Sequence, residues 1–113
     1  MTDKGKGSDT DFHHQADSLL QGLFDVIDAR LGDRYDVDFI DDVLNIETDD
    51  GNIFVINKSA PMRQIWLSSP VSGASHYSFQ DSGSGWVSTR DDRVLLEVLA
   101  EDLAKLSGVK ISL

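Results

Sequence analysis

The sequence contains no cysteine among its 113 residues, which excludes disulfide bonds, thiolate catalysis and metal clusters ligated by cysteines of the chain itself. No apolar run approaches the ~20 residues that a membrane-spanning helix requires. The N-terminal residues have neither the apolar core of a signal peptide nor the arginine-rich, acid-poor character of a transit peptide. The length suits one domain. We therefore expect a small cytoplasmic protein that does not associate with membranes.

Basic residues are also few. Ten Lys and Arg stand against twenty Asp and Glu, and the formal net charge is −10. Phosphate backbones repel such a chain, so nucleic acids are not expected as partners. The whole imbalance lies in residues 1–52, which hold fourteen acids and four bases, because residues 53–113 hold six of each. An acidic region of this kind can attract cations or a basic partner. Acids that only keep a small domain soluble would give the same composition.

The spacing of apolar residues divides the chain into a tail and one domain. Residues 1–10 are polar and lack an apolar period, which predicts a disordered tail ahead of a single domain at residues 11–113. From Phe12 to Leu31 apolar residues recur at i, i+4 and i+7. This spacing predicts a helix that ends at Gly32.

A second helix is predicted near the C-terminus, with Asp91 or Asp92 as N-cap and Gly108 as its stop. Alternating or continuous apolar segments predict about six strands between the helices, at residues 35–41, 43–48, 53–57, 63–68, 76–79 and 86–89, with turns at 41–42, 49–52 and 82–85. Consecutive strands with short connections form an antiparallel sheet, and both helices should cover one of its faces. The predicted fold class is an α+β two-layer sandwich with one open sheet face.

No pattern in the sequence indicates nucleophilic or single-site metal catalysis. His13 and His14 are adjacent and point to different faces of the first helix, and His76 stands alone in a strand. Residues 49–52 resemble part of a calcium loop, but the other ligand positions and the terminal Glu are missing. A hairpin turn is therefore the favoured interpretation of this segment, and we do not expect an enzyme.

Eight aspartates are the candidate metal ligands, because they follow one face of the first helix, one side of the first strand and the two ends of that strand. They are Asp17, Asp25, Asp28, Asp33, Asp36, Asp38, Asp41 and Asp42. If helix and strand are neighbours, their carboxylates form a hard-oxygen surface suited to Ca²⁺, Mg²⁺, Mn²⁺ or iron, bound weakly at several sites. An ordinary solvated helix face beside a strand edge fits the same pattern.

A second candidate site is the strand predicted at residues 63–68. Alternation places Ile65 and Leu67 on one side and Gln64, Trp66 and Ser68 on the other. If the aliphatic side faces the helices, Trp66 stands on the open face of the sheet, where an aromatic ringed by polar groups is a typical interface anchor. The alternative is a tryptophan that a neighbouring side chain covers.

With this order of elements, the chain resembles the frataxin family, in its bacterial CyaY-like branch, over about residues 12–107. The matching segments are Val55-Ile56-Asn57-Lys58, Pro61, Gln64-Ile65-Trp66-Leu67-Ser68-Ser69-Pro70, Ser72-Gly73, Tyr35-Asp36-Val37, Val43-Leu44 and Trp86-Val87. The resemblance implies an accessory protein of iron–sulfur cluster assembly, whose acids on the first helix and strand bind Fe²⁺ or Fe³⁺.

The resemblance also implies partners, namely a cysteine desulfurase and the iron–sulfur scaffold protein. They would dock on the open face around Trp66, to which Asn57, Gln64 and Ser68 contribute. The leading hypothesis is a monomeric regulator or iron donor of cluster assembly. Two rivals stay open: a weak ferroxidase and iron store that forms an oligomer with iron, and an acidic interaction module that needs no metal.

Overall fold

The structure is a computed structural model that describes residues 9–80 and 85–113. Residues 1–8 of the expected tail and residues 82–84 of the expected turn lie outside the described residues, and residues 9–10, also expected in the tail, belong to the first helix. Helices α1 (Asp9–Leu31) and α2 (Leu95–Ser107) flank the strands in the chain. The strands are β1 (Asp36–Ile40), β2 (Val43–Glu47), β3 (Ile53–Ser59), β4 (Gln64–Ser69), β5 (Gly73–Gln80) and β6 (Gly85–Ser88).

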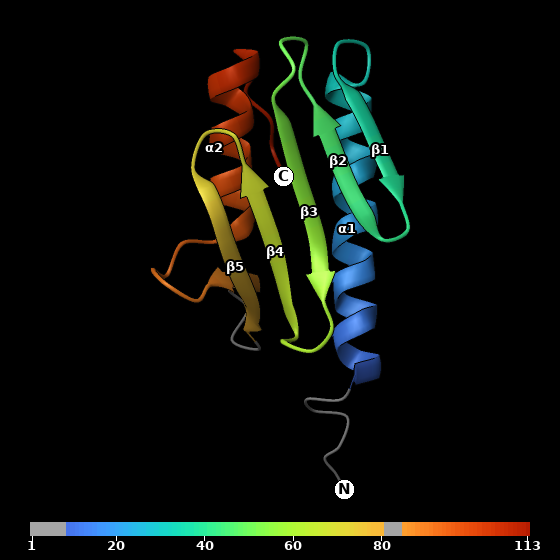
Figure 1. The fold of residues 1–113 in the computed structure, drawn as a ribbon, viewed down its shortest axis with the longest axis vertical. Coiled ribbons are helices and arrows are strands. Elements are labelled where there is room, and N and C mark those ends of the chain that lie inside the picture. Colours follow the sequence, from blue (N-terminus) through green and yellow to red (C-terminus); the bar gives the residue numbers. More distant parts are fainter. Residues whose placement is uncertain (1–8, 81–84) are drawn as a thin grey trace, which may run out of the picture.

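The strands form one antiparallel sheet in which the spatial order follows the chain from β1 to β6. Both helices lie against one face of this sheet, and the other face is open (Figure 1). The predicted α+β two-layer sandwich is thus confirmed. Within the described part of the chain, neither helix combines the length and hydrophobicity needed to cross a membrane.

The core lies between the sheet and the helices, and α1 enters it through the apolar stripe that its sequence predicts. Leu20 and Ile27 of this stripe are fully buried, as are Leu44 and Ile56 on the facing side of the sheet. Burial of one such side chain is worth about 1.5–3 kcal/mol. The stripe therefore fixes which side of α1 faces the sheet, and it leaves the acidic side of the helix in solvent.

A two-residue turn joins β1 to β2 and sets the register of this edge hairpin. Asp41 and Asp42 both adopt positive φ angles, 54° and 65°, as the central residues of a type I′ turn do. Next to the turn Ile40 pairs with Val43, and at the far end of β1 Asp36 pairs with Glu47. This register decides which carboxylates meet on the open face.

The predicted start of the second helix is wrong. The helix begins at Leu95, after an extended Val94 that provides no side-chain cap. Val94 instead forms a β-bridge with Val87 of β6. The carboxylate of Asp91 accepts a hydrogen bond from the backbone N–H of Arg93, so it stabilises a local turn and not a helix end. Arg93 and Val94 thus pair with the sheet edge, since the carbonyl of Arg93 also accepts the N–H of Ser88.

One carboxylate is buried in the core side of α2. Asp102 is only 3% exposed, and its Oδ2 accepts hydrogen bonds from the hydroxyls of Ser69 and Ser72, with oxygen–oxygen distances of 2.7 and 2.5 Å. The Ser69 hydroxyl in turn accepts the backbone N–H groups of Val71 and Ser72. This network ties the turn between β4 and β5 to α2, beside the strand that carries Trp66.

Candidate functional site: an acidic rim and an aromatic platform

All eight aspartates predicted as metal ligands are exposed, but they do not form one uniform surface. Those of α1 lie on the helix layer, whereas Asp36 and Asp38 of β1 project on the open face, since Val37 and Phe39, which alternate with them, pack toward the core. The acidic residues therefore wrap around the β1 edge of the sheet, where they form two groups and leave three aspartates apart from both.

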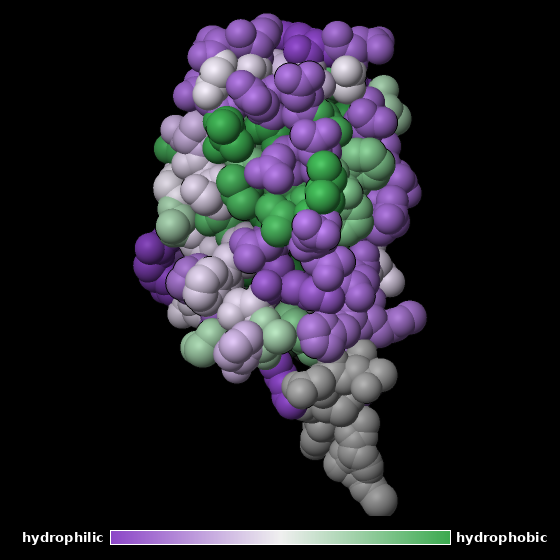
Figure 2. Space-filling model, turned by 45° about the vertical axis from the view of Figure 1, so that its right-hand side comes forward, coloured by the Kyte–Doolittle hydropathy of each residue, from purple (hydrophilic) through white to green (hydrophobic). Residues whose placement is uncertain are grey.

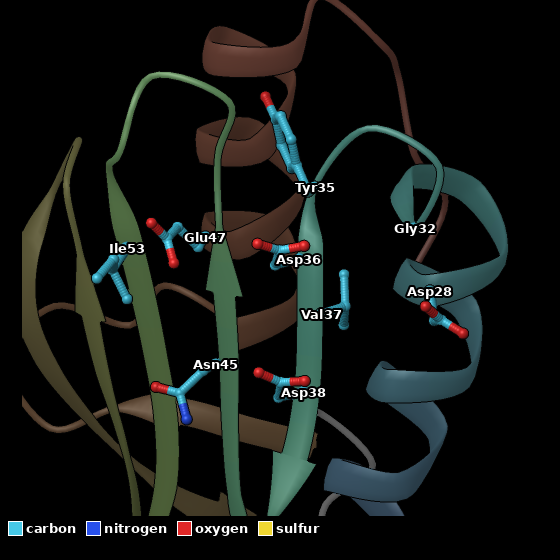
Figure 3. Close-up of a pocket in the computed structure, with 9 residues that line it drawn as sticks. All are labelled: Asp28, Gly32, Tyr35, Asp36, Val37, Asp38, Asn45, Glu47 and Ile53. Atoms are coloured by element: carbon cyan, nitrogen blue, oxygen red, sulfur yellow. The ribbon is translucent and has the colours of Figure 1, made fainter.

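The first group lines a depression of about 620 Å³ at the β1 edge. Figure 3 shows Asp36 and Asp38 one above the other on β1, and Asp28 on α1 beyond Val37. Glu47 of β2 adds another carboxylate, because it pairs directly with Asp36. We call Asp36, Asp38 and Glu47 the acidic rim. Glu47 was not among the predicted ligands, although counting outward from the turn at residues 41–42 places it opposite Asp36.

The close approach of two backbone segments shapes the helix side of this depression. The N–H of Gly32 donates to the carbonyl of Asp28 over 2.8 Å. A Cβ at position 32 would lie 2.4 Å from that same oxygen, which no side chain can occupy. Glycine is therefore required where the chain leaves α1 and turns toward β1, which confirms the predicted stop at Gly32.

The second group lies at the opposite end of β1, where a lysine joins two of the predicted ligands. Lys58 Nζ lies 2.6 Å from Asp17 Oδ1 and 3.7 Å from Asp42 Oδ2. The lysine side chain is only 14% exposed. It comes from the core-facing side of β3, so these contacts connect α1, the β1–β2 turn and β3. No sequence pattern links residues 41 positions apart, and this ion pair was not predicted.

The other predicted ligands have separate surroundings. Asp25 accepts a hydrogen bond from the Gln21 amide over 3.0 Å, while Asp33 and Asp41 are exposed in turns. Among the described residues, no three His, Asp or Glu side chains converge closely enough to hold one metal ion. The carboxylates can attract cations to an open surface, on which solvent would complete the coordination. Their role as metal ligands remains a prediction.

The turn between β2 and β3 presents further acids above the rim, and these are engaged within the protein. Arg34 Nε donates to Asp49 over 2.9 Å, and this hydrogen bond raises the pKa of the guanidinium above its ordinary value. The Thr48 hydroxyl donates to Asp50, and this hydrogen bond lowers the pKa of that carboxyl. These two acids stabilise the turn, so they add less to a cation-binding surface than their number suggests.

Trp66 stands on the open face, as alternation along β4 predicts, with 37% of its surface exposed. Its indole Nε1 donates to Gln64 Oε1 over 2.9 Å. The imidazole of His76 on β5 stacks on the indole with ring centroids 4.5 Å apart and planes 16° apart. One face of the tryptophan is thus covered, and the ring is held in place. The contact of His76 with Trp66 depends on the β4–β5 register, which the spacing of residues does not determine.

The sheet register extends the platform around Trp66 across five strands. A single lateral row contains Ile40, Val43, Asn57, Trp66 and His76, each opposite the next. Ser68 lies one pleat along from Trp66 on the same face and is exposed. The four predicted partner-binding residues, Asn57, Gln64, Trp66 and Ser68, therefore share one face. Their role in binding remains a prediction.

The acidic rim belongs to this same open face. Asp38 and Trp66 are three strands apart, about 14 Å across the sheet at the usual spacing between strands, and their rows are offset by two residues along the strands. Exposed apolar side chains also lie on this face, with Ile40 of β1 63% and Ile53 of β3 48% exposed. Figure 2 shows this side as a green apolar area bordered by purple hydrophilic residues. A single partner can therefore contact the rim, the aliphatic area and the tryptophan together.

Comparison with known proteins identifies relatives of the chain. A family model described as the frataxin-like domain matches residues 6–109. The mitochondrial frataxin homolog of Schizosaccharomyces pombe is 36% identical over 89% of this chain, which spans about two thirds of that relative (66%). The iron–sulfur cluster assembly protein CyaY of Neisseria meningitidis serogroup C is 29% identical and is covered almost completely, over 94% of this chain and 95% of the relative.

Solved structures share the fold. Frataxin from Psychromonas ingrahamii, of the CyaY protein family, superposes with a TM-score of 0.80 at 25% identity, over 93% of this chain and 96% of that one. A trimeric frataxin from the yeast Saccharomyces cerevisiae, crystallised with ferrous iron, superposes with a TM-score of 0.74 at 31% identity. That match covers 84% of this chain and 87% of the yeast chain.

Proposed function

The chain belongs to the frataxin family, and we propose that it is an iron-binding accessory protein of iron–sulfur cluster assembly. Its relatives are named frataxin or iron–sulfur cluster assembly protein CyaY. In this proposal it regulates the complex of a cysteine desulfurase and a scaffold protein, or donates iron to it, in the cytoplasm. The protein itself would be a monomer when free of iron.

One observation carries the docking part of the proposal, namely that the acidic rim and Trp66 share one open face. A matching partner needs a recess for the indole and basic side chains about 14 Å away. Trp66 is suited to anchoring because its hydrogen bond to Gln64 and its stack on His76 already hold the ring. Less side-chain entropy is then lost when the partner binds.

Iron is the cargo in this proposal and is held at the surface by carboxylate oxygens. Asp36 and Glu47 are adjacent across two strands, and Asp38 follows on the same face. Hard oxygen donors suit Fe²⁺ and Fe³⁺, and an exposed, incomplete ligand set favours weak binding and rapid release. Rapid release suits a protein that delivers iron or reports its concentration to another complex.

The two rival functions use the same acids differently. A ferroxidase needs carboxylates that converge on iron, and among the described residues no three candidate ligands do so. This arrangement favours regulation or delivery over catalysed oxidation by the monomer. Oxygen consumption with Fe²⁺ would distinguish them, because a rate above the buffer blank supports a ferroxidase. A metal-independent interaction module would bind its partner equally well with and without iron.

An anaerobic Fe²⁺ titration followed by amide NMR tests the metal part directly. We expect the resonances of Asp36, Asp38 and Glu47 to change at lower Fe²⁺ than that of Trp66, and those of α2 to stay unchanged. Glu47→Gln is the test variant and Glu97→Gln in α2 is its matched control. Each substitution removes one exposed carboxylate, but only Glu47 lies on the rim. Equal effects of the two variants on the titration would contradict a site at the rim.

A further inference from the structure

Lys58 introduces a positive charge of the protein itself among the predicted iron ligands. It follows Asn57 on β3, and the alternation of the strand turns it toward the helix layer. There its ammonium contacts Asp17 of α1 and Asp42 of the β1–β2 turn, which are 52% and 61% exposed. A side chain that is 14% exposed thus places its charged end between two accessible carboxylates.

The acidic rim differs from this pair because it holds no such cation. In the described part of the chain, neither Asp36, Asp38 nor Glu47 forms an ion pair, whereas Asp17 and Asp42 share the one ammonium. A metal ion that approaches Asp17 or Asp42 must therefore displace a tethered competitor. Approach to the rim requires only the displacement of solvent and mobile counterions.

We propose that Lys58 is a tethered counter-cation that closes the Asp17–Asp42 end of the acidic surface to metal ions and directs them to the acidic rim. This inference rests on the proposed function of the acids as metal ligands. It makes Lys58 the residue that determines where ions bind. In this inference α1 and β1 both carry predicted ligands, but only the end of the surface at the acidic rim is open to metal ions.

The test compares two ends of the same molecule and uses Ca²⁺ as a redox-silent hard cation. Side-chain carboxyl ¹³C shifts follow each carboxylate separately during a Ca²⁺ titration. The measured quantity is the ratio of the midpoint concentration at Asp17 and Asp42 to that at Asp36 and Asp38. A change in net charge affects both ends, so this ratio isolates the local effect.

In the unmodified protein we expect the ratio to be well above one. Lys58→Met keeps the aliphatic stem and removes the ammonium, and it should lower the ratio roughly threefold to tenfold, the range expected when two exposed ion pairs are removed. Lys58→Arg should keep the ratio high. Lys105→Met, at an exposed lysine of α2, removes the same charge elsewhere and should leave the ratio unchanged.

Two results would overturn the inference. One is a ratio near one in the unmodified protein, which needs no variant and is decisive even if Lys58→Met fails to fold. The other is a folded Lys58→Met protein with the ratio unchanged. A different result would reject the acidic rim as a metal site: neither Ca²⁺ nor Fe²⁺ would then affect Asp36, Asp38 and Glu47. Failure of the Lys58 inference can therefore be distinguished from failure of the proposed metal site.

Discussion

Trp66→Ala is the substitution that separates docking from folding most clearly. In the folded protein it removes the stack on His76 and the hydrogen bond to Gln64. An aromatic pair is worth about 0.5–1.5 kcal/mol, and an exposed neutral hydrogen bond about 0.5–1 kcal/mol. Because the indole stands on the open face and is not part of the core, its removal leaves no cavity in the core. We expect the free energy of unfolding to fall by about 1–2 kcal/mol.

The effect of the same substitution on binding should be larger. A tryptophan at the centre of an interface contributes 2 kcal/mol or more, so affinity for the desulfurase–scaffold complex should fall at least about thirtyfold. Isothermal titration calorimetry measures this affinity, and urea unfolding monitored by circular dichroism measures stability. The two measurements on one variant show whether binding is lost independently of folding.

Phe79→Ala provides a matched control for Trp66→Ala. Phe79 is 40% exposed, close to the value for Trp66, but it packs on Trp86 on the helix side of the sheet. Its removal should leave affinity for the complex within about twofold. A folded Trp66→Ala protein with full affinity, or an equal loss of affinity in both variants, would show that the open face around Trp66 is not the docking surface.

Three further predictions concern the scaffold of the site. Asp102→Ala removes the buried acceptor of two serine hydroxyls and should lower the free energy of unfolding by about 2–4 kcal/mol in urea denaturation; a loss below 1 kcal/mol would show that the network is dispensable. The hydrogen bond from Thr48 lowers the pKa of Asp50 below 3.8, so its stabilising effect is present above pH 3.8 and is lost as pH falls through the lowered value. Unfolding midpoints at pH 5 and pH 3 should therefore differ less in Asp50→Asn than in the unmodified protein, and an equal difference would contradict this assignment. Asp41→Gly relieves a positive φ and should raise the thermal midpoint slightly, whereas a lower midpoint would show that the turn depends on the aspartate side chain.

The predictable parts of the fold are those that local spacing determines. The stripe from Phe12 to Leu31 and the two-residue turn at Asp41 and Asp42 required no tertiary information. Together with alternation along β4, they gave the architecture and the exposed position of Trp66. Glu47 was also within reach, because the register of a two-residue hairpin follows from its turn.

The parts that sequence reasoning missed depend on contacts between distant segments. Val94 pairs with Val87 of β6, and this contact with the sheet edge overrides the capping preference of Asp91. Lys58 of the sheet contacts Asp17 of the helix layer. His76 meets Trp66 only because the β4–β5 turn has a particular length. Spacing along the chain carries no signal for such contacts, since they are decided by how layers and strands align.

The central claim is that one open face carries both the acidic rim and the aromatic platform, and that one partner covers both. The most direct measurement is amide NMR of the labelled protein during titration with the desulfurase–scaffold complex. We predict that the resonances of Asp36, Asp38 and Glu47 lose intensity together with those of Asn57 and Trp66, while exposed residues of α2 do not. Loss confined to the helix layer, with Trp66 unaffected, would show that the partner does not bind the open face.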